Sequence, residues 1–163
     1  SLLLAALALL LAVPAGPALA GCTDPPAPGV NWQRCNFDGL DLSAVDLSGA
    51  RLRDGSYFRT NLTGADLSGV EGYRAKFINA SLIGADLSGA DLERVDFTKA
   101  DLTDADFTGA DLRNARLTRA NLTGADLSNA QTEGADFFRA DLSGATWIDG
   151  VRVCKEGSVG RCN

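Results

Sequence analysis

The chain has 163 residues, of which 15 are basic and 21 acidic, and its formal net charge at pH 7 is −6. It contains no His, which removes the usual general base and the commonest zinc ligand and argues against triad hydrolases and His-based zinc enzymes. The acidic balance argues against a non-specific nucleic-acid binder, because such proteins need a positive surface.

The first predicted element is residues 1–20, which carry no charge and begin with an apolar run from Leu2 to Val13. This run is too short to span a bilayer core of about 30 Å, which takes about 20 residues. It fits the apolar region of a secretory signal peptide, and the Pro and Gly residues that follow fit the segment before a cleavage site. No basic residue or initiator Met precedes the run, so we expect the natural chain to begin further upstream.

Two cleavage patterns overlap at the end of this segment. Ala18 and Ala20 form the small-x-small pattern of ordinary signal peptidase, which predicts a mature chain that starts at Gly21. The stretch from Leu19 to Cys22 also resembles the lipobox of bacterial lipoproteins, in which Cys22 is lipidated. The Pro-containing gap before this stretch favours the first pattern, so export to the periplasm or the medium is predicted. A protein anchored by lipid in the cell envelope is the alternative.

From Cys35 to Asp149 the sequence repeats every five residues without an insertion or deletion. The consensus is Ala-Asp-Leu-Ser-Gly, and its third position, the centre, is Leu, Phe, Tyr or Trp in all units except those of Gly72 and Thr132. In a helix of about 100° per residue the centres would advance by about 140° per unit and cover every side, which excludes an amphipathic helix. An extended Ala-Asp-Leu segment instead points Ala and Leu inward and Asp outward, and the Ser-Gly pair turns the chain.

The exceptions to Leu recur with a period of 20 residues. One column of centres is mainly aromatic, with Phe37, Tyr57, Phe77, Phe97 and Phe137. Gly72 and Thr132 share another column. Four units therefore form one coil, and the repeats make about 5.75 coils, or a rod of about 28 Å at about 4.8 Å per coil. Such units cannot bury their apolar side alone and must stack into a solenoid.

These units resemble the pentapeptide-repeat family, whose consensus is Ala-(Asp/Asn)-Leu-x-x. The resemblance covers residues 35–149 and implies an all-β fold, a right-handed quadrilateral parallel β-helix. The segment around Trp32 and the segment from Cys154 to Cys162 look like the flanks of exported bacterial members. The family's best-known members imitate DNA with an acidic rod and protect or inhibit DNA gyrase. This chain departs from them by its export signal and by basic residues that interrupt the acidic surface.

Function must lie on outward positions, because Ala, Leu and the aromatic centres fill the interior. One outward column is entirely acidic and is a weak candidate for a divalent-cation groove or an anionic recognition stripe: Asp46, Asp66, Asp86, Asp106 and Asp126. Neighbours about 4.8 Å apart repel by roughly 0.9 kcal/mol in water, which counterions or donor groups in the corners must relieve. The simpler interpretation is that each Asp accepts hydrogen bonds from its own turn, so no metal is predicted.

A second outward column combines basic and apolar side chains. Its basic residues are Arg59, Lys99, Arg119 and Arg139, and beside them the apolar residues Phe58, Ile78 and Phe138 replace the usual Ser or Thr. An interrupted apolar patch flanked by Arg is typical of a protein contact, whereas scattered exposed apolar residues need no function. At Gly72 and Thr132 we expect neighbouring side chains to fill the space of the missing large residue, and a small-molecule pocket is the alternative.

The remaining segments, 21–34 and 150–163, are predicted to cap the repeat domain 35–149, because unpaired strand edges at the ends of a stack invite association. Four Cys allow three pairings. The rod would hold the front and rear pairs about 28 Å apart, whereas a disulfide needs Cα atoms within about 7 Å. The predicted disulfides are Cys22–Cys35 and Cys154–Cys162.

Together these patterns predict a non-enzymatic, exported β-helical scaffold that presents flat faces to a protein partner. No unit combines a nucleophile with a base, a Gly-rich phosphate loop after a strand or a metal cluster, so no catalytic residue and no cofactor is predicted. Nucleic acid is not a predicted partner, and a membrane is one only if Cys22 is lipidated. A DNA-mimicking inhibitor or protector of a topoisomerase is the alternative of a different class.

Overall fold

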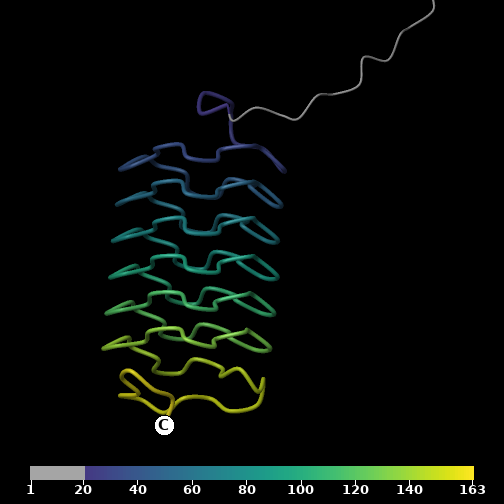
Figure 1. The fold of residues 1–163 in the computed structure, drawn as a ribbon. Coiled ribbons are helices and arrows are strands. Elements are labelled where there is room, and N and C mark those ends of the chain that lie inside the picture. Colours follow the sequence, from purple (N-terminus) through teal and green to yellow (C-terminus); the bar gives the residue numbers. More distant parts are fainter. Residues whose placement is uncertain (1–20) are drawn as a thin grey trace, which may run out of the picture.

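The computed structural model describes residues 21–163, and the predicted signal peptide at 1–20 lies outside the described residues. Successive coils stack along one axis in sequence order, from the purple front coil to the yellow C-terminal segment in Figure 1. Parallel bridges join residues 20 positions apart, from Asn31 with Arg51 to Asp126 with Thr146. The predicted period of 20 residues per coil is therefore confirmed.

Coils pair through single residues rather than continuous strands, and residues 21–163 form no helix. Accordingly, no helix in this range could cross a membrane. Each coil has four sides, and we name each side by a central residue: Phe37 on side 1, Leu42 on side 2, Leu47 on side 3 and Leu52 on side 4. Every side recurs at intervals of 20 residues. The two residues that follow each centre form a corner.

Backbone hydrogen bonds run in both directions along the stack. The Leu62 N–H donates to the Ser81 carbonyl at 2.7 Å, and the Asn61 N–H donates to the Leu40 carbonyl at 2.9 Å. Nearly every corner also closes a tight turn, as where the Ala65 N–H donates to the Leu62 carbonyl at 3.0 Å. From residue 34 to residue 144 the second corner residue has a left-handed backbone, with φ between 54° and 59° where it is not Gly. This conformation explains why Gly is the consensus there.

The interior is a packed core and not a pore. Ala and Leu positions are buried, and the Asp positions between them face outward, as the sequence predicts. The aromatic column stacks along the axis, with ring centroids 4.8 Å apart for Tyr57 and Phe77 and 5.3 Å apart for Phe77 and Phe97. At Gly72 an added Cβ would lie 2.9 Å from Leu92 Cδ2. The neighbouring coil therefore fills the space of the missing large side chain.

Each end carries one of the predicted disulfides. Cys22–Cys35 lies at the front with a Cα–Cα distance of 5.4 Å, and Cys154–Cys162 lies at the rear with 4.8 Å. No free Cys occurs in the part of the chain that the structure describes. The coil register begins before Cys35, because Asn31 already pairs with Arg51 and Trp32, 1% exposed, fills the central position of side 4.

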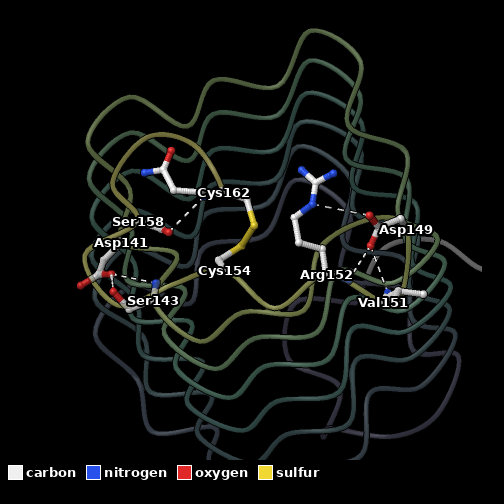
Figure 2. The surroundings of a disulfide bond; sticks show 9 residues. Asp141, Ser143, Asp149, Val151, Arg152, Cys154, Ser158 and Cys162 are labelled. Atoms are coloured by element: carbon white, nitrogen blue, oxygen red, sulfur yellow. Dashed lines mark hydrogen bonds and ion pairs between the residues drawn. A yellow bond between two sulfur atoms is a disulfide. The ribbon is translucent and has the colours of Figure 1, made fainter.

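The rear segment covers only half of the last coil. Val153 pairs antiparallel with Thr146 on side 3, and Val159 pairs antiparallel with Asp141 on side 2. Figure 2 shows the Cys154–Cys162 disulfide beside Ser158, inside the outline of the coils. Within residues 21–163, no bridge covers sides 4 and 1 of this coil from behind. Inward residues there are therefore only partly buried: Thr132, Ala135 and Phe137.

Candidate functional site

The outer wall of the rod is divided by charge. The twelve basic residues between positions 34 and 149 all lie on side 4, on side 1 or at the two corners of side 1. Side 2, side 3 and the corners that follow them carry ten acidic residues and no basic residue in the same range. Side 4, side 1 and the two corners of side 1 also carry nine acidic residues, so this half of the wall is mixed in sign, whereas the other half is purely acidic.

The acidic column lies on side 3, and each Asp accepts a hydrogen bond from its own turn. Asp66 Oδ1 accepts the Ser68 N–H at 2.9 Å and the Ser68 hydroxyl at 2.6 Å. The equivalent N–H bond is made by all five members. At Asp46 the Ser48 hydroxyl, followed by the Ser48 N–H, lowers the pKa of the carboxyl. Donor groups in the corner thus relieve the repulsion between the stacked carboxylates.

No metal centre is organised around this column. Residues 21–163 hold no group of three or more His, Cys, Asp or Glu side chains arranged to bind a metal ion. Consecutive members such as Asp66 and Asp86 pair through their backbones and turn their carboxylates to their own Ser or Thr. Asp46, Asp66, Asp86, Asp106 and Asp126 stay the weak candidates for a divalent-cation groove that they are in the sequence.

The predicted contact residues share the corner between sides 1 and 2. We call this set the aromatic–basic corner: Phe58, Arg59, Ile78, Lys99, Arg119, Phe138 and Arg139. The Arg59 guanidinium lies 4.8 Å from the centroid of the Phe58 ring, and the Arg139 guanidinium lies 5.2 Å from that of Phe138. Phe138 is 59% exposed, and Phe58 and Ile78 are half-buried. Aromatic rings beside guanidinium groups are the side chains that protein interfaces favour.

The basic residues of this corner occupy strained backbone positions. Arg59, Lys99 and Arg119 have φ values of 57°, 58° and 59°. A left-handed backbone costs a non-Gly residue about 1 kcal/mol, and Gly avoids this cost. The corners after sides 2 and 3 are mostly Gly. Residues that break a local rule are expected where another role offsets the cost. Arg74 and Arg94 at the other corner of side 1 share this backbone, but only the corner between sides 1 and 2 adds Phe58 and Phe138 beside its Arg residues, so it is the leading candidate for a contact surface.

A second basic group, at the corner between sides 4 and 1, was not found from the sequence. A hollow of about 570 Å³ lies there, lined by four cations and two carboxylates among its polar residues: Arg74, Lys76, Arg94, Arg116, Asp96 and Asp136. Its signal is present in the sequence, since Arg74 and Arg94 are 20 residues apart and therefore adjacent in the stack. Finding it requires aligning the outward positions of all coils, including the corner residues.

The interior offers no reactive group to the surface. Tyr57 Oη is buried and has no hydrogen-bond partner within residues 21–163, and burial raises the pKa of this hydroxyl above its usual range. Its ring occupies space that a Cβ at Gly55 would enter, at 2.8 Å from Tyr57 Cε2. The Tyr57 hydroxyl is therefore a packing feature inside the rod, and the wall is suited to binding.

Comparison with known proteins places these features in context. A family model described as pentapeptide repeats matches residues 27–54, 58–94, 75–114 and 115–146, with eight copies. These matches cover well over half of the chain. No curated protein matches the chain.

Several solved structures are similar to the chain. HetL, a pentapeptide repeat protein involved in heterocyst differentiation regulation from the cyanobacterium Nostoc sp. strain PCC 7120, is 28% identical, with a TM-score of 0.48, over 76% of this chain and 68% of its own. A pentapeptide repeat protein from the Arabidopsis thaliana thylakoid lumen is 27% identical, with a TM-score of 0.29, over 78% of this chain and 83% of its own. QnrB1, a plasmid-mediated fluoroquinolone resistance protein, is 23% identical, with a TM-score of 0.43, over 72% of this chain and 65% of its own.

Proposed function

This chain belongs to the pentapeptide-repeat family, and from this premise we propose that it is a non-enzymatic scaffold that binds a protein partner through the aromatic–basic corner. Solved family members form right-handed quadrilateral β-helices, and we propose the same handedness here, with about 5.75 coils as the repeat length implies. A rigid rod of this kind holds surface side chains at fixed spacing. Binding then needs little ordering of the scaffold itself.

One observation carries the proposal. Phe58 and Phe138 stand at a turn position where most units have Ser or Thr, and both rings face the surface beside an Arg. Phe138 is exposed and Phe58 is half-buried, and burial of their remaining apolar surface by a partner would stabilise a complex. The guanidinium groups of Arg59 and Arg139 add directional contacts to carboxylates or carbonyls of the partner.

The test uses the oxidised chain of residues 21–163 as bait in a bacterial envelope extract. The variant Phe58→Ser with Phe138→Ser restores the common Ser at both turn positions and should fold normally. The control Ile83→Ser makes the same kind of change at an exposed apolar residue, 38% exposed, at the corner between sides 2 and 3. We expect one protein to be recovered by the wild type and by the control but lost with the double variant. Equal recovery by all three baits would contradict the proposal.

We further propose that residues 1–20 are a signal peptide, that 21–34 and 150–163 are caps around the repeat domain 35–149, and that the protein works outside the cytoplasm. Two disulfides support an oxidising compartment, since they persist there and are rare in the cytosol. Intact mass of the exported protein tests this. A chain that starts at Gly21 with two disulfides is expected, whereas a diacylglyceryl adduct on Cys22 would replace it with the lipoprotein alternative.

A second candidate is mimicry of DNA toward a topoisomerase, which the ten acidic residues on side 2, side 3 and their following corners favour. The twelve basic residues on the other two sides argue against it, because a duplex mimic presents negative charge. Gyrase supercoiling in the presence of residues 21–163 separates the two candidates. No effect at stoichiometric dose is expected, and protection or inhibition at that dose would make mimicry the better explanation.

A further inference from the structure

We propose that the hollow at the corner between sides 4 and 1, which we call the cationic hollow, binds an oxyanionic ligand that carries at least two phosphate or carboxylate groups. The cationic hollow is formed by Arg74, Lys76, Arg94, Arg116 and their neighbours. It shares no residue with the aromatic–basic corner, and the inference does not depend on the proposed protein partner.

The shape of the cationic hollow follows from one column of corner residues. This column has Arg74 and Arg94 in two successive coils and then the shorter residues Asn114 and Gly134 in the next two. The two Arg side chains form one wall, and the short residues leave open space beside them. An added Cβ at Gly134 would lie 2.6 Å from Asn114 Oδ1. A larger residue at position 134 would therefore displace Asn114 and fill the hollow.

The residues that line the hollow carry a formal charge of +2, from four cations and two carboxylates. Asp54 and Glu93, outside the lining, pair with two of these cations. Asp96 accepts a hydrogen bond from Arg116 at 2.8 Å. Asp136 Oδ2 accepts the Thr118 hydroxyl at 2.9 Å. Lys76 makes no ion pair in the part of the chain that the structure describes. A ligand with two negative groups would neutralise the charge of the lining when it replaces the exposed ion pairs of Arg74 and Arg94.

The Arg side chains retain donors for a ligand. Arg74 pairs with Asp54 through Nε at 3.3 Å, and Arg94 approaches Glu93 through Nε at 3.6 Å. Both acidic partners lie outside the lining of the hollow. The two Arg side chains are 61% and 58% exposed, and exposed ion pairs of this kind contribute less than about 1 kcal/mol. Arg94 Nη1 also donates to Tyr73 Oη at 3.4 Å. The terminal nitrogens of Arg74, and Nη2 of Arg94, are therefore available for the contacts that guanidinium makes with phosphate or carboxylate.

The charge on the other sides of the rod favours binding of an anion at the cationic hollow. Side 2, side 3 and their following corners carry only negative charge and repel an anion, whereas the cationic hollow attracts it. Its volume of about 570 Å³ exceeds the need of one phosphate group and falls in the range of sites for small organic ligands. The inferred ligand is therefore a small molecule with several anionic groups.

The test is calorimetric titration of residues 21–163 with inorganic pyrophosphate in one arm and citrate in the other, at low salt. The test variant is Arg74→Ala with Arg94→Ala, and the matched control is Lys99→Ala with Arg119→Ala. All four residues occupy the same corner position, with φ values of 57°, 58°, 58° and 59°, and both variants remove two positive charges. We expect a Kd below about 1 mM for the wild type, at least about tenfold weaker binding in the test variant and less than about twofold change in the control.

The two titrations distinguish the chemical class of the ligand. Binding of pyrophosphate alone supports a phosphorylated ligand, and binding of citrate alone supports a polycarboxylate. Absence of binding in both arms, or equal weakening in both variants, would overturn the inference and leave only the general effect of net charge. The control variant lies in the aromatic–basic corner, so it should lose the protein partner while it retains anion binding. Failure of one proposal is thereby distinguished from failure of the other.

Discussion

The middle and the last coils of the rod have the same five-residue pattern but bury it differently. Phe97 is fully buried, with the Phe77 ring 5.3 Å away on one side and the next coil on the other. Phe137 occupies the same column in the last coil, yet it is partly exposed and its ring contact is the tilted Trp147 at 5.6 Å. The pattern thus determines which residues point inward, whereas the neighbouring coils determine how well these residues are buried.

The largest expected effect tests this difference directly. Phe97→Ala should lower the free energy of unfolding by about 4 kcal/mol, because it removes a fully buried ring and leaves a cavity closed on both sides. Phe137→Ala should cost about 2 kcal/mol, because its site opens to water and needs no empty cavity. Urea denaturation of the oxidised chain measures both values. Equal losses would show that coil position has no influence on burial energy.

Removal of each disulfide in turn compares how much the front and rear bonds stabilise the fold. Cys22→Ser with Cys35→Ser opens a loop with a sequence separation of 13, and Cys154→Ser with Cys162→Ser opens one of 8. The chain-entropy model gives a loss of about 3 kcal/mol for the front and about 2.5 kcal/mol for the rear.

Amide hydrogen exchange locates the two effects. The rear variant should increase exchange of the Leu142 N–H, which donates to the Ser158 carbonyl in the rear segment. The front variant serves as the control and should leave this amide unchanged. Faster exchange at Leu142 in both variants would mean that the ends are coupled through the whole rod rather than stabilised separately.

The features that sequence reasoning predicted are those that the pattern itself determines. The 20-residue coil, the inward Leu and aromatic columns and the local pairing of Cys22 with Cys35 follow from spacing alone. The coil around Trp32 was assigned to the front cap because the residues beside Trp32 lack the Ala and Asp of the consensus. Its hydrogen bonds to the next coil need no particular side chain, as where the Trp32 N–H donates to the Arg51 carbonyl at 2.8 Å.

The features that sequence reasoning missed depend on contacts between side chains of different coils. The cationic hollow requires Arg94 to lie beside the shorter Asn114, a relation between corner residues of different coils. The partial exposure of Phe137 depends on where the segment around Val153 and Val159 folds back, which covers sides 2 and 3 alone. Neither relation appears in the repeat consensus.

One substitution in the aromatic column is expected to raise the free energy of unfolding, by less than the preceding changes lower it. Tyr57 and Phe77 stack at 4.8 Å and are both fully buried, but Tyr57 Oη has no hydrogen-bond partner within residues 21–163. An unpaired buried hydroxyl costs about 1 kcal/mol or more, so Tyr57→Phe should raise the free energy of unfolding by about 1 kcal/mol. The converse change, Phe77→Tyr, is the control and should destabilise. Destabilisation by Tyr57→Phe would indicate a partner for this hydroxyl.

The smallest expected effect concerns pH and again compares front and rear. Asp141 Oδ1 accepts the Ser143 hydroxyl at 2.7 Å and the Ser143 N–H at 3.0 Å, and the Ser143 hydroxyl oxygen accepts the Gly157 N–H at 3.0 Å. Figure 2 shows Asp141 and Ser143 side by side at the edge of the coil. The Ser143 hydroxyl, followed by the Ser143 N–H, lowers the pKa of Asp141. Asp46 has the same arrangement with Ser48 near the front, and its pKa is also lowered.

A carboxyl whose pKa is lower in the folded chain stabilises the fold above its unfolded pKa of about 3.9, and this contribution disappears as the pH falls through the folded value. NMR titration of the carboxyl should therefore give a pKa for Asp141 below 3.8, and Ser143→Ala should move it upward. Because Ser143 also holds Gly157, acid should speed exchange of the Gly157 amide beyond the intrinsic pH effect, and Ser143→Ala should abolish this extra dependence. The matched Ser48→Ala should raise the pKa of Asp46 and leave Gly157 unchanged. An unchanged Asp141 pKa in Ser143→Ala would show that the hydroxyl is not what couples this carboxylate to the rear segment.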